Sequence, residues 1–98
     1  MSDAPSPYRT TPVFDETSLP AALKREHSTK AGVWGVIRVL EGRLRLVHLD
    51  PVREESLSPS RPGLILPERT HYVRPEGAMK MQVEFYDRPP QILQGDPA

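Results

Sequence analysis

Twelve prolines limit the fold of this 98-residue chain more than any other feature of its sequence. Each proline lacks a backbone N–H donor, so it interrupts helices and the interior strands of a sheet. The prolines fall mainly in the first 20 residues, between positions 51 and 75, and near the C-terminus. We therefore expect a flexible tail at residues 1–10, a single domain at residues 11–87 and a proline-rich tail at residues 88–98.

Between the prolines, residues 33–49 carry the clearest strand pattern. Residues 33–40 are rich in β-branched side chains, and the residues after position 42 alternate between an apolar and a basic face. Glu41 and Gly42, which separate the two parts, are a tight-turn signal. The pattern predicts an antiparallel hairpin over residues 33–49 that turns at this dipeptide.

Two further segments, residues 64–66 and 79–86, are apolar enough to form strands. The second alternates with a period of two, which places four apolar side chains on one face, those of Met79, Met81, Val83 and Phe85. Residues 18–27 fit either a short helical turn or an extended entry into the first strand. Short strands between glycine and proline turns are typical of an all-β sandwich or barrel with antiparallel strands and little helix. The predicted core consists of Trp34, Leu44, Leu46, Leu64, Leu66, Val83 and Phe85.

The charge of the chain excludes several classes of partner. Its 13 basic and 13 acidic residues give a formal net charge of zero, so we expect neither nucleic acid nor an anionic membrane as the main partner. No apolar run approaches the roughly 18 residues of a membrane span. The chain has no cysteine, which excludes disulfides and a thiolate zinc site and fits a cytoplasmic protein.

The segment "GLILPERTHYV" at residues 63–73 has a spacing of glycine, proline and histidine that resembles a cupin motif. Pro67 would end a strand at the rim of a barrel, and His71 would then point into the cavity or remain at the rim. The segments "TKAGVWGVIRVLEG" and "LPERTH" resemble a family of small bacterial cupin-like proteins related to the tellurite-resistance protein TehB and to YeaR. This resemblance covers residues 8–87 and implies a barrel of the double-stranded β-helix type.

The same resemblance bears on cofactors. In some relatives the domain precedes a methyltransferase that uses S-adenosylmethionine. This chain has no glycine-rich nucleotide loop, so we expect neither methyl transfer nor a nucleotide cofactor. A cupin barrel commonly holds a metal, and the resemblance implies one divalent ion, which would be zinc, iron or nickel. Its reduced ligand set would be His27, His71 and Glu84.

The sequence leaves the details of this site open. The usual first cupin motif has a second histidine where this chain has Thr29. Glu84 would point into the barrel only if the polar face of its strand is the inner one. Four other residues are expected to line the cavity or to support the ligands, with a purely structural role as the alternative for each: Trp34, His48, Glu68 and Tyr86.

Three functions are therefore predicted as alternatives. The first is a binding or sensing module that holds a metal ion or a small ligand and is linked to tellurite or another stress. The second is a small metal-dependent enzyme, such as a dioxygenase or an isomerase. The third is an interaction domain without a ligand. Exposed edge strands would in each case favour a homodimer.

Overall fold

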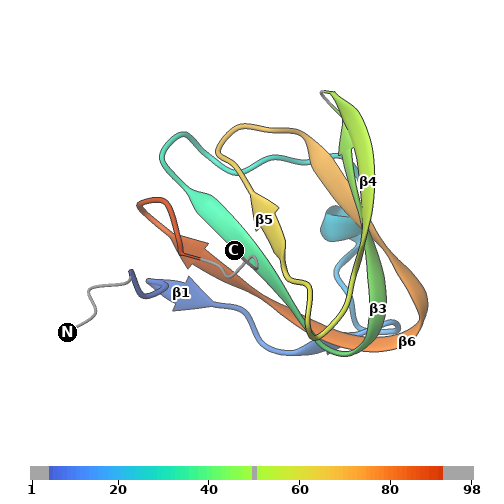
Figure 1. The fold of residues 1–98 in the computed structure, drawn as a ribbon. Helices are drawn as coiled ribbons and strands as arrows, with labels where there is room; N and C mark the ends of the chain where they lie inside the picture. Colours follow the sequence, from blue (N-terminus) through green and yellow to red (C-terminus); the bar gives the residue numbers. More distant parts are fainter. Residues whose placement is uncertain (1–4, 50, 92–98) are drawn as a thin grey trace.

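The structure of the protein is a computed structural model that describes residues 5–49 and 51–91. It is a curved antiparallel sheet with one short helical turn, as Figure 1 shows. The prediction of an all-β fold with antiparallel strands and almost no helix is confirmed. In chain order the elements are β1 (Arg9–Thr10), β2 (Phe14–Asp15), the 3-10 helix η1 (Ala21–Lys24), β3 (Trp34–Leu49), β4 (Val52–Leu57), β5 (Gly63–Ile65) and β6 (His71–Tyr86).

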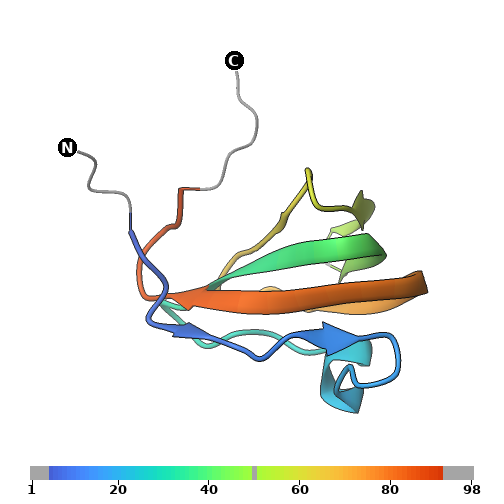
Figure 2. The ribbon, with the colours of Figure 1, turned by 90° about the horizontal axis from the view of Figure 1, so that it is seen from below.

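Two strands of 16 residues each, β3 and β6, are the central pair of the sheet. They pair from one end to the other, with Trp34 opposite Tyr86 at one end and His48 opposite His71 at the other. The first part of β3 also pairs with β5, and its second part pairs with β4. The N-terminal strands β1 and β2 pair with the opposite edge of β6, so η1 and the N-terminal segment lie on that side (Figure 2).

The predicted hairpin over residues 33–49 is wrong, because β3 continues through Glu41 and Gly42 as one strand. The register with β6 shifts between Val39 and Glu41 and again between Gly42 and Leu44. Such bulges bend a strand and increase its twist, which allows β3 and β6 to curve into both halves of the sheet. Gly42 thus marks a bend within a strand, a position that attracts glycine as a tight turn does.

Gly42 is needed for two separate reasons. Its φ of +75° lies in the left-handed region, and a Cβ atom there would collide with the backbone carbonyl oxygen of Ala78. Gly77 has a φ of +96° but nothing within 4 Å of the position of a Cβ. The two glycines therefore separate the cost of the backbone conformation from the cost of the collision.

We expect Gly42→Ala to lower the free energy of unfolding by about 2 kcal/mol, because a left-handed conformation alone costs a residue with a Cβ about 1–2 kcal/mol. Gly77→Ala is the matched control and should cost less, since it lacks the collision. Urea denaturation of both variants measures the difference. Equal losses of unfolding free energy for the two variants would show that the backbone of β6 at Ala78 shifts and relieves the collision.

The core lies on the concave face of the sheet, where the inward-facing residues of both long strands meet. Of the predicted core residues, Leu44, Leu46 and Val83 are buried in the core cluster, and the half-buried Phe85 packs against it. The predictions for Trp34, Leu64 and Leu66 were wrong, because none of the three belongs to this cluster. The full cluster consists of Leu19, Ile37, Val39, Leu44, Leu46, Leu57, Ile65, Val73, Met79, Met81 and Val83.

Strand β5 presents the opposite face from the one predicted. Leu66 is 40% exposed and Leu64 is half-buried, whereas Ile65 between them is only 2% exposed. Ile65 lies opposite Gly35 in the register with β3 and therefore points into the core. Because side chains alternate along a strand, an error of one residue reverses every inward position.

The helical alternative for residues 18–27 holds for the single turn η1. A loop stabilised by Asp15 precedes it, in which the backbone N–H groups of Thr17 and Ser18 donate to one carboxylate oxygen at 2.8 Å. Leu19 is buried in the core and Leu23, in η1, packs against it. This placement brings the chain that follows η1 across the concave face of the sheet.

The predicted tails fall partly on residues 1–4 and 92–98, which lie outside the described residues. Within the described part, Arg9 and Thr10 pair with Phe85 and Glu84. The domain boundaries stay a prediction. None of the helical residues that the structure describes forms a segment long and apolar enough to cross a membrane.

Candidate functional site

A cavity of about 320 Å³ opens on the concave face of the sheet. Its volume lies at the lower end of the range for small-molecule pockets, which is about 300–1,000 Å³. The sheet supplies an apolar wall, and the segment after η1 together with the N-terminal strand supplies the other side. The lining residues are Tyr8, Arg9, Thr11, Leu23, His27, Ser28, Thr29, Lys30, Val33, Gly35, Ile37, Ile65, His71, Val73, Met81, Val83 and Phe85.

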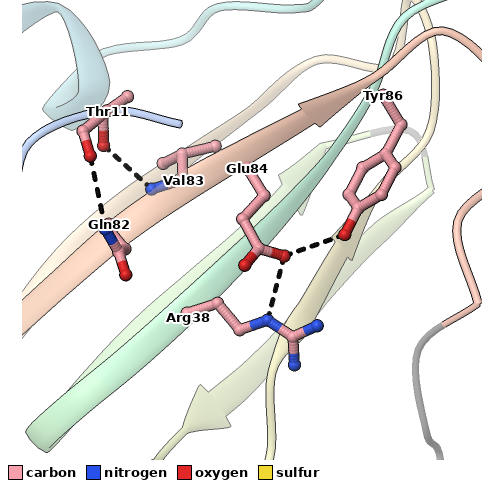
Figure 3. Close-up of polar contacts among 6 residues, drawn as sticks. All are labelled: Thr11, Arg38, Gln82, Val83, Glu84 and Tyr86. Atoms are coloured by element: carbon pink, nitrogen blue, oxygen red, sulfur yellow. Dashed lines mark hydrogen bonds and ion pairs between the residues drawn. The ribbon is translucent and has the colours of Figure 1, made fainter. Parts of the chain in front are cut away.

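The N-terminal side of the cavity is fixed to β6 through Thr11. The Thr11 hydroxyl accepts a hydrogen bond from the backbone N–H of Val83 at 3.0 Å, and the amide of Gln82 donates to the Thr11 carbonyl at 3.3 Å (Figure 3). Arg9 lies over the ring of Phe85 at 5.4 Å from its centroid. These contacts hold the rim of the cavity against the last part of β6.

Two histidines, His27 and His71, meet at the cavity. Their backbones form a bridge in which each N–H donates to the other residue's carbonyl at 2.9 Å. The ring centroids lie 4.2 Å apart in an edge-to-face arrangement. His71 is 4% exposed, whereas His27 is half-buried. The structure thus brings together two of the three predicted ligands.

The hydrogen bonds of these histidines define which ring nitrogen carries the proton. The Nδ1 atom of His71 lies 2.9 Å from the carbonyl oxygen of Arg69, and that of His27 lies 2.8 Å from the carbonyl oxygen of Arg25. A carbonyl oxygen only accepts, so each Nδ1 is the donor. In the neutral ring, Nε2 is then left as an acceptor.

Burial lowers the pKa of His71 to about 4. The main cause is loss of water around the ring, which disfavours the charged form. The Arg69 carbonyl acts in the opposite direction, and the neighbouring His27 and His48 lower the pKa a little further. His71 is therefore neutral near pH 7.

The third histidine, His48, lies on β3 opposite His71, and His27 is bridged to His71 from outside the named strands, so all three histidines of the chain lie in one row. Its Nε2 lies 2.8 Å from a carboxylate oxygen of Glu55, which Arg53 also contacts at 3.2 Å. His48 is half-buried and is engaged in this hydrogen bond, directly opposite His71.

Glu84, the third predicted ligand, lies on the convex face of β6. Its carboxylate accepts a hydrogen bond from Arg38 Nε at 3.1 Å and from the Tyr86 hydroxyl at 2.9 Å (Figure 3). The neighbouring Val83 and Phe85 line the cavity from the other face. Because successive side chains of a strand point to opposite faces, Glu84 cannot join the two histidines.

The other predicted cavity residues take structural places. Trp34 lies opposite Tyr86 in the register, and both share the convex face with Glu84. Burial, followed by the hydrogen bond to Glu84, raises the pKa of Tyr86. The backbone N–H of Glu68 donates to the Thr29 carbonyl at 3.1 Å, and Glu68 itself has a φ of 62°. The Arg69 carbonyl is the group that orients His71.

The predicted divalent metal is not supported by this arrangement. Among residues 5–49 and 51–91, no group of three or more histidine, aspartate or glutamate side chains is placed to hold a metal ion. The physical reason is the direction of Glu84, which leaves only His27 and His71 at the cavity. Several lining residues were not predicted as site residues, including Ile65, Val73 and Met81. The alternation of β6 would have identified Met81, once its apolar face is taken as the inner one.

Fold and site together define a small all-β domain with an apolar pocket that ends in a histidine pair. The family model described as the TehB-like domain matches residues 9–83. The chain therefore belongs to the TehB-like family, which confirms the predicted relation to TehB. The relation to YeaR stays a prediction.

Two similar sequences come from Haemophilus influenzae, one from strain ATCC 51907 and one from strain 10810. Each is 32% identical over 71 residues and is named a probable S-adenosyl-L-methionine-dependent methyltransferase TehB. The match covers 67% of this chain and 25% of each relative. The chain thus spans about a quarter of the length of the curated relatives that it matches.

Two solved structures are similar to the fold. The crystal structure of TehB from Haemophilus influenzae has a TM-score of 0.77 at 27% identity, over 88% of this chain and 32% of that one. A protein of Escherichia coli strain K12 has a TM-score of 0.79 at 17% identity, over 91% of this chain and 96% of that one. The second likeness concerns the fold alone.

These findings correct the predicted function. The relatives that share the domain are named as methyltransferases that depend on S-adenosyl-L-methionine. The predictions of a metal-binding or sensing cupin module, of a metal-dependent dioxygenase or isomerase and of an interaction domain without a ligand were therefore wrong. The predicted cofactor, a divalent metal with no nucleotide, was wrong for the same reason.

Proposed function

We propose that this chain serves S-adenosyl-L-methionine-dependent methyl transfer by holding the small molecule that receives the methyl group. The observation that carries the proposal is the apolar cavity, whose lining lies almost entirely within residues 9–83 of the TehB-like match. The relatives' names supply the reaction class. The lining supplies a place for an acceptor of small size.

The sequence indicates which of the two substrates, methyl donor or methyl acceptor, this domain would bind. The chain contains no glycine-rich loop of the kind that cradles a nucleotide. In the proposal, the methyl donor is therefore held by a methyltransferase that works with this domain, and this domain holds the acceptor. Methyl transfer needs the acceptor atom about 3–3.5 Å from the methyl carbon with water kept away, so a preformed apolar pocket favours the reaction.

A transfer assay tests this proposal. The methyltransferase would be TehB of Haemophilus influenzae without its 71 matching residues, supplied with tritiated S-adenosyl-L-methionine and a small-molecule extract of bacterial cells. We expect the added chain to raise the transfer of label to small molecules. Val83→Phe, which fills the cavity, should remove this gain, whereas Lys80→Phe on the exposed face of the same strand should keep it.

Three outcomes would contradict the proposal. The first is equal transfer with and without the chain, and the second is equal activity of the two phenylalanine variants. The third is direct binding of S-adenosyl-L-methionine to the isolated chain in calorimetry, which would make this domain the donor site.

Finer features of the protein belong to the same proposal. The curved path of β3 and β6, each shared by both parts of the sheet, supports a cupin-type double-stranded β-helix. A cytoplasmic location, a homodimer and a role in tellurite resistance stay predictions of the sequence.

A further inference from the structure

The Nε2 atom of His71 is a buried polar atom that the domain itself leaves without a partner. His71 is 4% exposed, and its Nδ1–H is used by the Arg69 carbonyl. Within the described part of the chain, no hydrogen bond reaches Nε2. Buried polar atoms in proteins are almost always hydrogen-bonded, and an exception calls for an explanation. Because His71 lines the cavity, a bound molecule can supply the missing donor.

His27 adds a second acceptor beside the first. Its Nδ1–H is used by the Arg25 carbonyl, so the Nε2 of the neutral ring is again an acceptor. The two rings lie 4.2 Å apart and both line the cavity. One molecule can therefore approach both imidazoles at once.

The remaining polar groups near the histidines are already engaged or lie at the rim. The Thr29 hydroxyl donates to the Val33 carbonyl at 2.7 Å. Apart from Thr11, which is bonded to β6, the other polar or cationic residues of the lining are exposed, namely Tyr8, Arg9, Ser28 and Lys30. The wall opposite is formed by apolar side chains of β3, β5 and β6. The histidine end of the cavity thus offers hydrogen-bond acceptors in apolar surroundings.

The geometry points to a binding site for a small alcohol, thiol or amine with an apolar body, whose O–H, S–H or N–H group donates to His71 Nε2 beside His27. A carboxylate would place its oxygen lone pairs against those of the imidazoles, so this end of the cavity disfavours anions. The inference rests on the proposed function only where it identifies such a molecule as the methyl acceptor. Binding itself requires no methyl donor.

Three matched probes test the inference on the intact chain: benzyl alcohol, toluene and benzoate. Affinities are measured by NMR titration near pH 7 with a chelator present, so that metal ions play no part. A net hydrogen bond of ordinary strength predicts that benzyl alcohol binds about 2- to 10-fold more tightly than toluene. The ¹⁵N resonance of His71 Nε2 should shift with benzyl alcohol. Benzoate should bind more weakly than either probe or bind only at the rim, without shifting this resonance.

Variants of His71 separate the acceptor from the shape of the pocket. His71→Asn can keep a donor toward the Arg69 carbonyl but lacks a group at the Nε2 position. It should bind toluene as the wild type does and lose the preference for benzyl alcohol. His71→Gln places an amide near that position and should restore part of the preference. His48→Asn is the control, because His48 bonds to Glu55 and should leave the preference unchanged.

Three results would overturn the inference. The first is equal affinity of the wild type for toluene and benzyl alcohol. The second is tightest binding by benzoate with a shift of the His71 Nε2 resonance, and the third is a preference for the alcohol that persists in folded His71→Asn. The ¹H–¹⁵N spectrum of each variant reports whether it is folded. If benzyl alcohol is preferred but the chain does not raise methyl transfer, the binding site is supported and its role in methyl transfer is contradicted.

Discussion

Replacement of Leu46 by alanine is expected to lower the free energy of unfolding by about 2–5 kcal/mol. Leu46 is 0% exposed and lies in the middle of the core cluster. A Cβ atom added at Gly63 would come within 2.9 Å of a Leu46 methyl group, which shows how closely the neighbouring strand approaches. Such close packing around β3 limits collapse into the space that the leucine leaves, so a cavity remains.

Urea denaturation measures this loss, and Leu66→Ala is its control. Leu66 is also a leucine in an apolar segment, but it is 40% exposed. Its replacement should change the free energy of unfolding by less than about 1 kcal/mol, because little apolar area leaves the protein interior. Similar losses of unfolding free energy for the two variants would show that β5 or β3 directs other side chains into the core than those described.

Acidification is expected to destabilise the protein because of His71. Burial lowers the pKa of this residue to about 4, against an ordinary value of 6.5 in the unfolded chain. Between these two values the unfolded chain binds a proton that the native protein does not, so the free energy of unfolding falls as the pH falls. This stability is fully present above pH 6.5, and the loss over the whole interval is at most about 3 kcal/mol.

Denaturation curves between about pH 7 and pH 4.5 measure the effect, since most of the loss falls in this range. Acidic groups act mainly at lower pH: hydrogen bonds from Thr17 and Ser18 lower the pKa of Asp15 to about 2, and those from Ser56 and Arg45 lower the pKa of Glu76. In the His71→Asn variant the slope between pH 6.5 and pH 4.5 should flatten. Parallel slopes for variant and wild type would mean that His71 protonates as freely in the folded protein as in the unfolded chain.

The alternating segments were predictable from the sequence because one face of each is apolar. Residues 79–86 have Met79, Met81 and Val83 at every second position, and all three are buried as the period of two requires. Residues 64–66 are apolar without a break, so nothing in the segment distinguishes its two faces. Only the pairing of Ile65 with Gly35 decides which one points inward.

The candidate site was less accessible to sequence analysis for a related reason. The meeting of His27 and His71 was expected from a family resemblance, since the two residues are far apart in the chain and no periodicity connects them. The direction of the Glu84 side chain does not follow from the sequence, because alternation defines two faces of a strand without showing which one is the inner face. Gly42 predicts a turn as readily as a bend within a strand, because glycine adopts the positive φ that either can need.

The continuous pairing of β3 with β6 also has a consequence for how the chain acquires its structure. Each contact between the two strands closes a loop of many residues, since Trp34 meets Tyr86 and Gly42 meets Met79. Strands β4 and β5 attach to β3, and β1 and β2 attach to β6. Nascent chain that ends before residue 71 lacks the central partner, and domains dominated by such distant pairings fold in about milliseconds to seconds. The complete sheet can therefore form only once the last third of the chain is available.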